Sequence, residues 1–128
     1  MNGPIARAGE SGGMMEECLF CRIINGSIPA KKVFEDVLVI VIEDIAPVAP
    51  LHLLIIPKRH FVNALDMRPE DRELVGHVFQ VAAEVARSRG VAADGFRIVN
   101  NNNEGAGQSV FHIHFHFLAG RRLTWPPG

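Results

Sequence analysis

The stretch Phe111-His112-Ile113-His114-Phe115-His116-Phe117-Leu118 alternates three histidines with bulky apolar residues. Alternation with a period of two residues is typical of a β-strand that buries one of its faces. The histidines would share one face of that strand, and the apolar side chains would share the other face and enter the core. The two sets are His112, His114 and His116 on the first face, and Ile113, Phe115 and Phe117 on the second.

This trio holds half of the 6 histidines in the chain, so it is not a scatter of surface residues. A single histidine on a strand is usually exposed or hydrogen-bonded, but three imidazoles on one face make a poor core. Imidazoles can bind a metal ion, bind phosphate or transfer protons near neutral pH. The trio therefore indicates a functional site, with these three chemistries left open by the pattern itself.

The composition limits the kinds of protein that this chain can be. It has 128 residues, of which 48% are hydrophobic, which suits one domain with one core. A net charge of −1 gives no general attraction to nucleic acid or to a membrane surface. The apolar runs are too short to span a bilayer, and no signal-peptide pattern opens the chain. We therefore expect a cytoplasmic protein that binds neither nucleic acid nor membrane.

The N-terminal part contains a glycine-rich stretch followed by a cysteine pair. Residues 1–15 are expected to form a flexible tail, and residues 16–128 a single domain. Cys18 and Cys21 have C-x-x-C spacing, which in a reducing compartment indicates a metal or redox site more than a structural disulfide. A short helix is expected at residues 18–24.

The rest of the chain predicts short strands and one long helix. Pro69 and the acidic residues after it suit a helix start, and Gly90 suits its end. Between them runs an apolar stripe made of Leu74, Val75, Val78, Phe79, Ala82, Val85 and Ala86. Strands are expected at residues 33–35, 37–43, 51–56, 96–99 and 111–118. The predicted class is α+β: a mostly antiparallel sheet of about five strands, covered on one face, with one main helix and a short N-terminal helix.

Several motifs around the histidine strand resemble those of the histidine-triad (HIT) superfamily, and within it the Hint branch of purine nucleoside phosphoramidases. The family pattern His-φ-His-φ-His-φ-φ, where φ is apolar, is matched by residues 112–118. The resemblance runs from about Cys18 to Gly128. Its further motifs are Ile28-Pro29-Ala30, Asp44-Ile45-Ala46-Pro47, His52, Ile56-Pro57-Lys58, Gly107-Gln108-Ser109-Val110 and Trp125-Pro126-Pro127-Gly128. The cysteine pair, and Glu43 where animal Hint proteins carry histidine, resemble the bacterial type.

The resemblance implies an enzyme, a hydrolase that acts on P–N bonds. His114 would attack the α-phosphorus of a nucleoside 5′-phosphoramidate or an acyl-nucleotide, and water would release the nucleoside monophosphate from the nucleotidyl-histidine. His116 would donate to a non-bridging phosphate oxygen, and His52 would be a fourth active-site histidine. Ser109 and Gln108 would reach the leaving group and the phosphate.

The same resemblance implies how the nucleotide is bound. Asp44 would accept hydrogen bonds from the ribose hydroxyls, and Asn101 would lie beside the phosphate. The run Asn100–Asn103 leaves that register open by one residue. As plain alternatives, Asp44 is a turn former, the asparagine run is a surface loop, and the apolar walls are ordinary core. The walls around the purine would be Phe20, Ile23, Ile28, Ile42 and Ile45.

Two further expectations follow from related proteins. The galactose-1-phosphate uridylyltransferases bind zinc through a C-x-x-C pair and two histidines, and the matching residues here are Cys18, Cys21, His60 and His112. A structural zinc would leave His114 free, whereas the simpler alternative is a pair of free thiols. The Hint resemblance also implies a homodimer that pairs through the main helix and an edge strand.

Two other functions remain open on the sequence. One is a dinucleoside polyphosphate hydrolase, as in the Fhit branch, although the ending Trp125-Pro126-Pro127-Gly128 argues against it. The other is a nucleotide-binding regulatory module without turnover, although a complete triad argues against that, because binding needs no nucleophile. The sequence indicates neither the leaving group nor a preference between adenine and guanine.

Overall fold

Five antiparallel strands form one sheet in the computed structural model, which describes residues 17–128. The strands are β1 (Lys32–Glu35), β2 (Val39–Glu43), β3 (Leu51–Pro57), β4 (Phe96–Val99) and β5 (Phe115–Ala119), in the spatial order β1-β2-β3-β5-β4. The helices are α3 (Leu19–Ile24) and α4 (Arg72–Ser88), and the 3-10 turns are η1 (Ala64–Asp66), η2 (Pro69–Asp71) and η3 (Glu104–Ala106). The predicted α+β class is confirmed, whereas the predicted tail at residues 1–15 lies outside the described residues.

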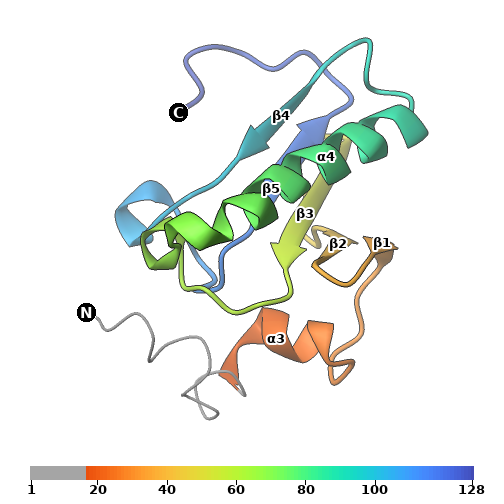
Figure 1. Ribbon diagram of the computed structural model, residues 1–128. Helices are drawn as coiled ribbons and strands as arrows, with labels where there is room; N and C mark the ends of the chain where they lie inside the picture. The colour runs from red at the N-terminus through yellow and green to blue at the C-terminus, as the bar shows by residue number, and fades with distance from the viewer. Residues whose placement is uncertain (1–16) are drawn as a thin grey trace.

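The long helix α4 crosses one face of the sheet and covers its centre (Figure 1). Pro69 opens the 3-10 turn η2 that leads into α4, and Gly90, at a φ of 74°, follows its end. The predicted apolar stripe is wrong at Phe79, which is 51% exposed, while Val81 is buried in its place. Val78 and Val81 lie on the face of α4 that packs on the sheet, and Phe79 lies at the margin of that face. Among the described residues, no helix has the length and hydropathy that a bilayer span requires.

The short helix α3 packs on the opposite face of the sheet. Its Phe20 joins a second apolar cluster whose strand residues are Ile40, Ile42, Leu54 and Ile56. The prediction that the strands are covered on one face is therefore wrong for β2 and β3, which are buried on both. A continuous apolar run, such as residues 39–42, is typical of a strand with two covered faces. Strand β5 keeps the predicted alternation, with Phe115 and Phe117 facing α4.

Strand β2 begins two residues later than predicted, at Val39 instead of Val37. The cause is Asp36, whose Oδ1 accepts the backbone N–H groups of Leu38 and Val39, both at 2.8 Å. A side-chain acceptor that captures two successive amides makes a turn of residues that would otherwise extend the strand.

Strand β5 begins at Phe115, so the predicted strand at residues 111–118 is too long at its start. The backbone before it is held in other ways. The N–H of Ile113 donates to the carbonyl of Phe61 at 2.7 Å, and the side chain of Asn100 donates to the carbonyl of His114 at 2.9 Å. His112 and His114 therefore lie just outside the ladder, and the ring of Phe20 on α3 packs against both of their rings.

Candidate active site and metal cluster

A pocket of about 590 Å³ opens between α3, the end of β2, the middle of β3, and β5 with the segment before it. This volume suits a small organic ligand. Apolar side chains dominate the lining, and two carboxylates, an ammonium group, a hydroxyl and two imidazoles supply polar groups. Nine of the predicted site residues line it together: Phe20, Ile23, Ile28, Ile42, Asp44, Ile45, Ser109, His114 and His116.

Seven lining residues were missed by the sequence reasoning: Leu19, Pro29, Ala30, Lys31, Glu43, Leu54 and Val110. A signal existed for Leu54, because it lies two residues after His52 on β3 and so shares its face. Lys31 and Glu43 form an exposed ion pair with 3.7 Å between Nζ and Oε1. No periodicity distinguishes these two from ordinary surface charges, so sequence reasoning had no means of finding them.

His114 lies in the pocket with one ring nitrogen free. Its Nδ1 is 2.7 Å from the carbonyl oxygen of His112, and a carbonyl only accepts, so Nδ1 carries the proton. The lone pair is therefore on Nε2. Burial lowers the pKa of His114 below its ordinary value, which keeps the ring neutral near pH 7. The edge of the Phe20 ring packs against it at 5.0 Å between centroids.

A chain of hydrogen bonds fixes the proton positions of the next two histidines. The N–H of Val48 donates to Nδ1 of His52 at 3.1 Å, so the proton of a neutral His52 is on Nε2. That Nε2 lies 2.9 Å from Nδ1 of His116, which must accept, and the proton of His116 is therefore on Nε2. Burial and the neighbouring His114 and His52 lower the pKa of His116 to about 4. His116 is thus a neutral ring with a donor at Nε2, and His52 supports it from behind.

Asp44 lies at the end of β2 and contacts both the turn after it and His52. Its Oδ1 accepts the N–H of Ala46 at 2.8 Å, and its Oδ2 lies 3.3 Å from Nε2 of His52. Each carboxylate oxygen has a further lone pair, so Asp44 can still accept from a ligand in the pocket. The side chains of Asp44, His52 and His116 are close enough together to hold an ion. The Nε2–H of His52 already lies between them, near Oδ2 of Asp44 and Nδ1 of His116.

Two predicted nucleotide-binding residues do not line the pocket. Gln108 is buried, and its Nε2 donates to the carbonyls of Val62 at 2.6 Å and Val110 at 3.1 Å, while its Oε1 accepts the N–H of Asn103 at 2.7 Å. Its amide is therefore occupied by the protein's own backbone. Asn101 also lies outside the lining residues. The neighbouring Ser109 is exposed and does line the pocket.

A second cluster joins α3 to the segment before β5. The structure brings together all four predicted metal ligands, Cys18, Cys21, His60 and His112, with donor atoms within 4.8 Å of one another. Nδ1 of His112 lies 3.4 Å from Sγ of Cys18 and 3.6 Å from Sγ of Cys21. Nδ1 of His60 lies 3.3 Å from Sγ of Cys21 and 3.0 Å from Nδ1 of His112.

The donor set fits a tetrahedral zinc ion. Bond lengths of about 2.0 Å to nitrogen and 2.3 Å to sulfur place tetrahedral donors roughly 3.3 to 3.8 Å apart, close to the distances found here. The Nε2–H of His112 donates to the carbonyl of Pro57 at 2.8 Å, which directs the lone pair of Nδ1 into the cluster. Burial beside Cys18 raises the pKa of Cys21 to about 12, so this thiol needs a cation beside it to ionise near neutral pH.

The sheet, the pocket and the histidine arrangement together define a histidine-triad domain. The family model of the HIT domain matches residues 25–123. The chain is 45% identical to an uncharacterized HIT-like protein of Synechocystis over 90% of this chain and all of that protein. It is 43% identical to the purine nucleoside phosphoramidase of Escherichia coli K12, over 86% of this chain and 92% of that protein.

Solved structures give the same result. A HIT family hydrolase from Legionella pneumophila is 49% identical with a TM-score of 0.85, covering 87% of this chain and 99% of that one. A histidine triad protein from Clostridium difficile is 41% identical with a TM-score of 0.81, covering 84% and 93%. The chain therefore belongs to the HIT family.

Proposed function

We propose that this protein is a nucleoside phosphoramidase, which cleaves the bond at the α-phosphate of nucleoside 5′-phosphoramidates or acyl-nucleotides. The observation that carries the proposal is the orientation of His114, whose Nδ1–H is held by the carbonyl of His112 while the ring lines the pocket. A neutral imidazole held in this way presents its Nε2 lone pair as a nucleophile. The name of the Escherichia coli relative supports the substrate class.

In the first step, Nε2 of His114 forms a bond to the α-phosphorus as the bond from phosphorus to the leaving group breaks. The leaving amine takes a proton from solvent as it departs, and the exposed hydroxyl of Ser109, which lines the pocket, can relay that proton. In the second step, water attacks the nucleotidyl-histidine, releases the nucleoside monophosphate and restores His114. One difficult displacement is thereby divided into two easier ones.

His116 stabilises the phosphate in both steps. Its Nε2–H is directed by the bond from His52 to its Nδ1, so it can donate to a non-bridging oxygen that gains negative charge in the transition state. Such a donor is most effective where its direction is fixed beforehand. His52 is therefore a positioning residue, because it acts on the phosphate only through His116.

The nucleoside would be held by the rest of the pocket. Phe20 and Ile23 from α3 and Ile42 from β2 offer apolar surface to a flat base, and Asp44 offers carboxylate lone pairs to the ribose hydroxyls. With the sugar at Asp44, the phosphate would lie at His114 and His116, because all three residues line the same pocket.

Zinc is proposed at the cluster of Cys18, Cys21, His60 and His112, where it would supply a structural cross-link and no reacting group. The ligand His112 keeps its carbonyl free for the Nδ1–H of His114. Because His114 is not part of the donor set, its Nε2 lone pair stays available for phosphorus.

The test is His114→Ala, measured with an adenosine 5′-phosphoramidate. Turnover should fall by roughly a thousandfold or more, because the nucleophile is lost, while AMP still binds. Denaturing mass spectrometry after brief mixing should find the nucleotidyl adduct on the wild type and none on the variant. His77→Ala is the matched control, since His77 lies on α4 outside the pocket and bonds to Asp36.

The assignment of His114 is wrong if His114→Ala keeps more than about a tenth of the wild-type kcat, a loss of only ~1.4 kcal/mol. A diadenosine polyphosphate in a parallel assay separates the proposed activity from the dinucleoside polyphosphate hydrolase. Turnover of neither substrate, with AMP bound, would leave only the binding module.

A further inference from the structure

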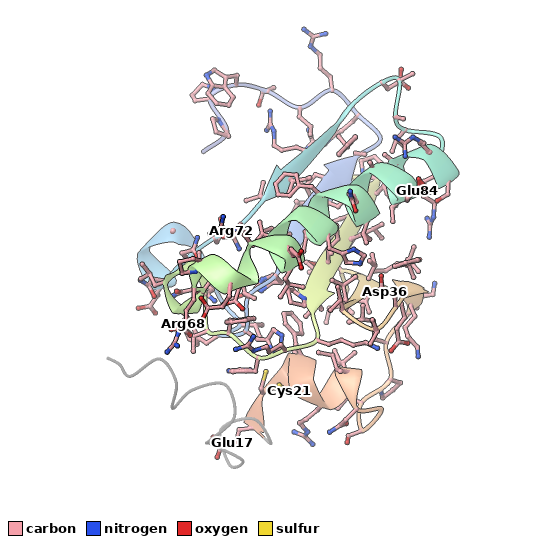
Figure 2. All side chains as sticks on the ribbon, in the orientation of Figure 1. Glu17, Cys21, Asp36, Arg68, Arg72 and Glu84 are labelled. Atoms are coloured by element: carbon pink, nitrogen blue, oxygen red, sulfur yellow. The ribbon has the colours of Figure 1, made fainter. Side chains whose placement is uncertain are left out.

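Helix α3 carries two kinds of residue that serve two different sites. Cys18 caps its N-terminus and Cys21 lies in its first turn, and both sulfurs belong to the metal cluster. Figure 2 shows Cys21 on the side of α3 that faces the rest of the domain. Leu19, Phe20 and Ile23 of the same helix line the nucleotide pocket. Metal ligands and pocket-lining residues are therefore interleaved within residues 18–23.

This helix cannot keep its shape without outside contacts. Six residues form less than two turns, and isolated helices of this length are not stable in water. Its apolar contacts come from Phe20, Ile23 and Ile24 against β2 and β3. A metal ion on Cys18 and Cys21 would tie the N-terminal turn to His60 and His112, and so fix the direction of the wall residues between the two cysteines.

His112 connects the same cluster to the nucleophile. Its Nε2 bonds to Pro57 and its Nδ1 faces the sulfurs, so the Pro57 carbonyl and a bound ion would hold the ring from its two sides. Its carbonyl oxygen accepts the Nδ1–H of His114 at 2.7 Å. The ring edge of Phe20 packs on both imidazoles, 5.8 Å from His112 and 5.0 Å from His114 between centroids. The position of His112 thus affects the ring that attacks phosphorus.

We propose that the cluster of Cys18, Cys21, His60 and His112 is a positioning site for the nucleotide pocket, so that zinc and nucleotide each strengthen the binding of the other through α3. The proposal rests on the proposed function for the identity of the ligand. Linkage of this kind is reciprocal: the factor by which zinc raises nucleotide affinity equals the factor by which nucleotide raises zinc affinity. A zinc ion that only stabilised the fold as a whole would leave the affinity of the folded pocket unchanged.

The experiment measures both sides of this linkage on the untagged full chain. AMP affinity is determined by calorimetry on zinc-loaded and zinc-free protein, and zinc affinity by competition with a chromophoric chelator, with and without saturating AMP. We expect zinc to raise AMP affinity roughly tenfold, and AMP to raise zinc affinity by the same factor. The rate of zinc release into excess chelator, which AMP should slow, needs no stable zinc-free protein.

Two pocket variants separate a linkage through α3 from a general effect. Phe20→Ala truncates one of the two side chains between the cysteines, and Ile42→Ala truncates a wall residue on β2. Both should weaken AMP binding. The coupling factor should fall towards 1 in Phe20→Ala and stay near the wild-type value in Ile42→Ala.

Each contrary outcome has its own meaning. Equal AMP affinity with and without zinc, together with unchanged zinc release, overturns the linkage and leaves nucleotide binding intact. Coupling that survives Phe20→Ala overturns the route through α3. Failure to take up zinc overturns the metal site and the linkage with it. Absence of AMP binding in both forms overturns the proposed function, and the linkage with it.

Discussion

At the scale of single residues, the site is defined by where each histidine carries its proton. Each assignment begins from a backbone group whose role is fixed: the N–H of Val48 donates to His52, and the carbonyl of His112 accepts from His114. From these, a neutral nucleophile at His114 and a neutral donor at His116 follow without adjustable choices. The alternation in the sequence predicted that the three histidines share a site, but only the backbone partners decide which nitrogen is free.

The pH dependence of turnover follows from these neutral rings. Burial lowers the pKa of His114 below the ordinary 6.5 and, with His114 and His52 nearby, that of His116 to about 4. A lowered pKa keeps imidazole neutral to more acidic pH, so kcat/KM should stay level as the pH falls through neutrality and should decline only below 6.5. The profile is measured with a leaving group that does not titrate in this range. Half-maximal kcat/KM at or above pH 6.5 would contradict the burial of the nucleophile.

Gln108 and Ser109 are neighbours in sequence but have different surroundings, and substitution should separate them. Gln108→Ala removes an amide that bonds to Val62, Asn103 and Val110, and should lower the free energy of unfolding by about 2 kcal/mol. Ser109→Ala should change it by less than about 0.5 kcal/mol and should lower kcat. Urea unfolding and turnover are measured for both variants. A normal stability for Gln108→Ala, with a loss of AMP affinity, would restore its role in nucleotide binding. Both residues matched the family motif. A loop has no regular period, so the sequence could not predict that the side chain of Gln108 is buried while that of Ser109 is exposed.

At the scale of elements, the sequence predicted which segments are strands but not what covers them. The alternation around His114 predicted one buried face for β5, which is confirmed, because a period of two is visible in a single strand. The run of apolar residues 39–42 in β2 has no such period, and the burial of its second face depends on α3, far away in the chain. The start of β5 depended on Asn100 and Phe61, which satisfy backbone groups that a ladder would otherwise use.

Glycine positions test the local geometry of these elements. Gly120 follows β5 at a φ of 99°, and a Cβ there would lie 2.8 Å from Cβ of Pro50. Gly120→Ala should therefore lower the free energy of unfolding by about 2 kcal/mol or more. A Cβ at Gly76 of α4 would meet no atom within 4 Å in the single chain, so Gly76→Ala should raise the stability of the monomer by about 0.5 to 1 kcal/mol. Both are measured by urea unfolding at one protein concentration. A neutral Gly120→Ala would mean that Pro50 moves freely away from it.

At the scale of the whole molecule, an edge strand and two large apolar side chains remain exposed among residues 17–128. Strand β4 is an edge of the sheet, opposite the edge formed by β1 (Figure 1). The C-terminal segment lies beside β4, because Arg97 donates to the carbonyl of Thr124, and the next residue, Trp125, is 80% exposed. Phe79 of α4 is 51% exposed. Unpaired edges are usually covered in proteins that stay soluble. We therefore propose that two copies of the chain pair through α4 and β4, as the HIT resemblance implies.

The pairing predicts that Phe79→Glu dissociates the dimer, because it places a charge in an apolar contact between helices. Light scattering coupled to size exclusion, at micromolar concentration, should give a dimeric mass for the wild type and a monomeric mass for the variant. The matched control is Val37→Glu, an equally apolar-to-acidic change at the turn between β1 and β2, where Val37 is 84% exposed. That turn lies beside the other edge of the sheet, so Val37→Glu should remain dimeric. A monomeric wild type would refute the pairing, and dissociation by Val37→Glu alone would place the contact at β1 instead of β4.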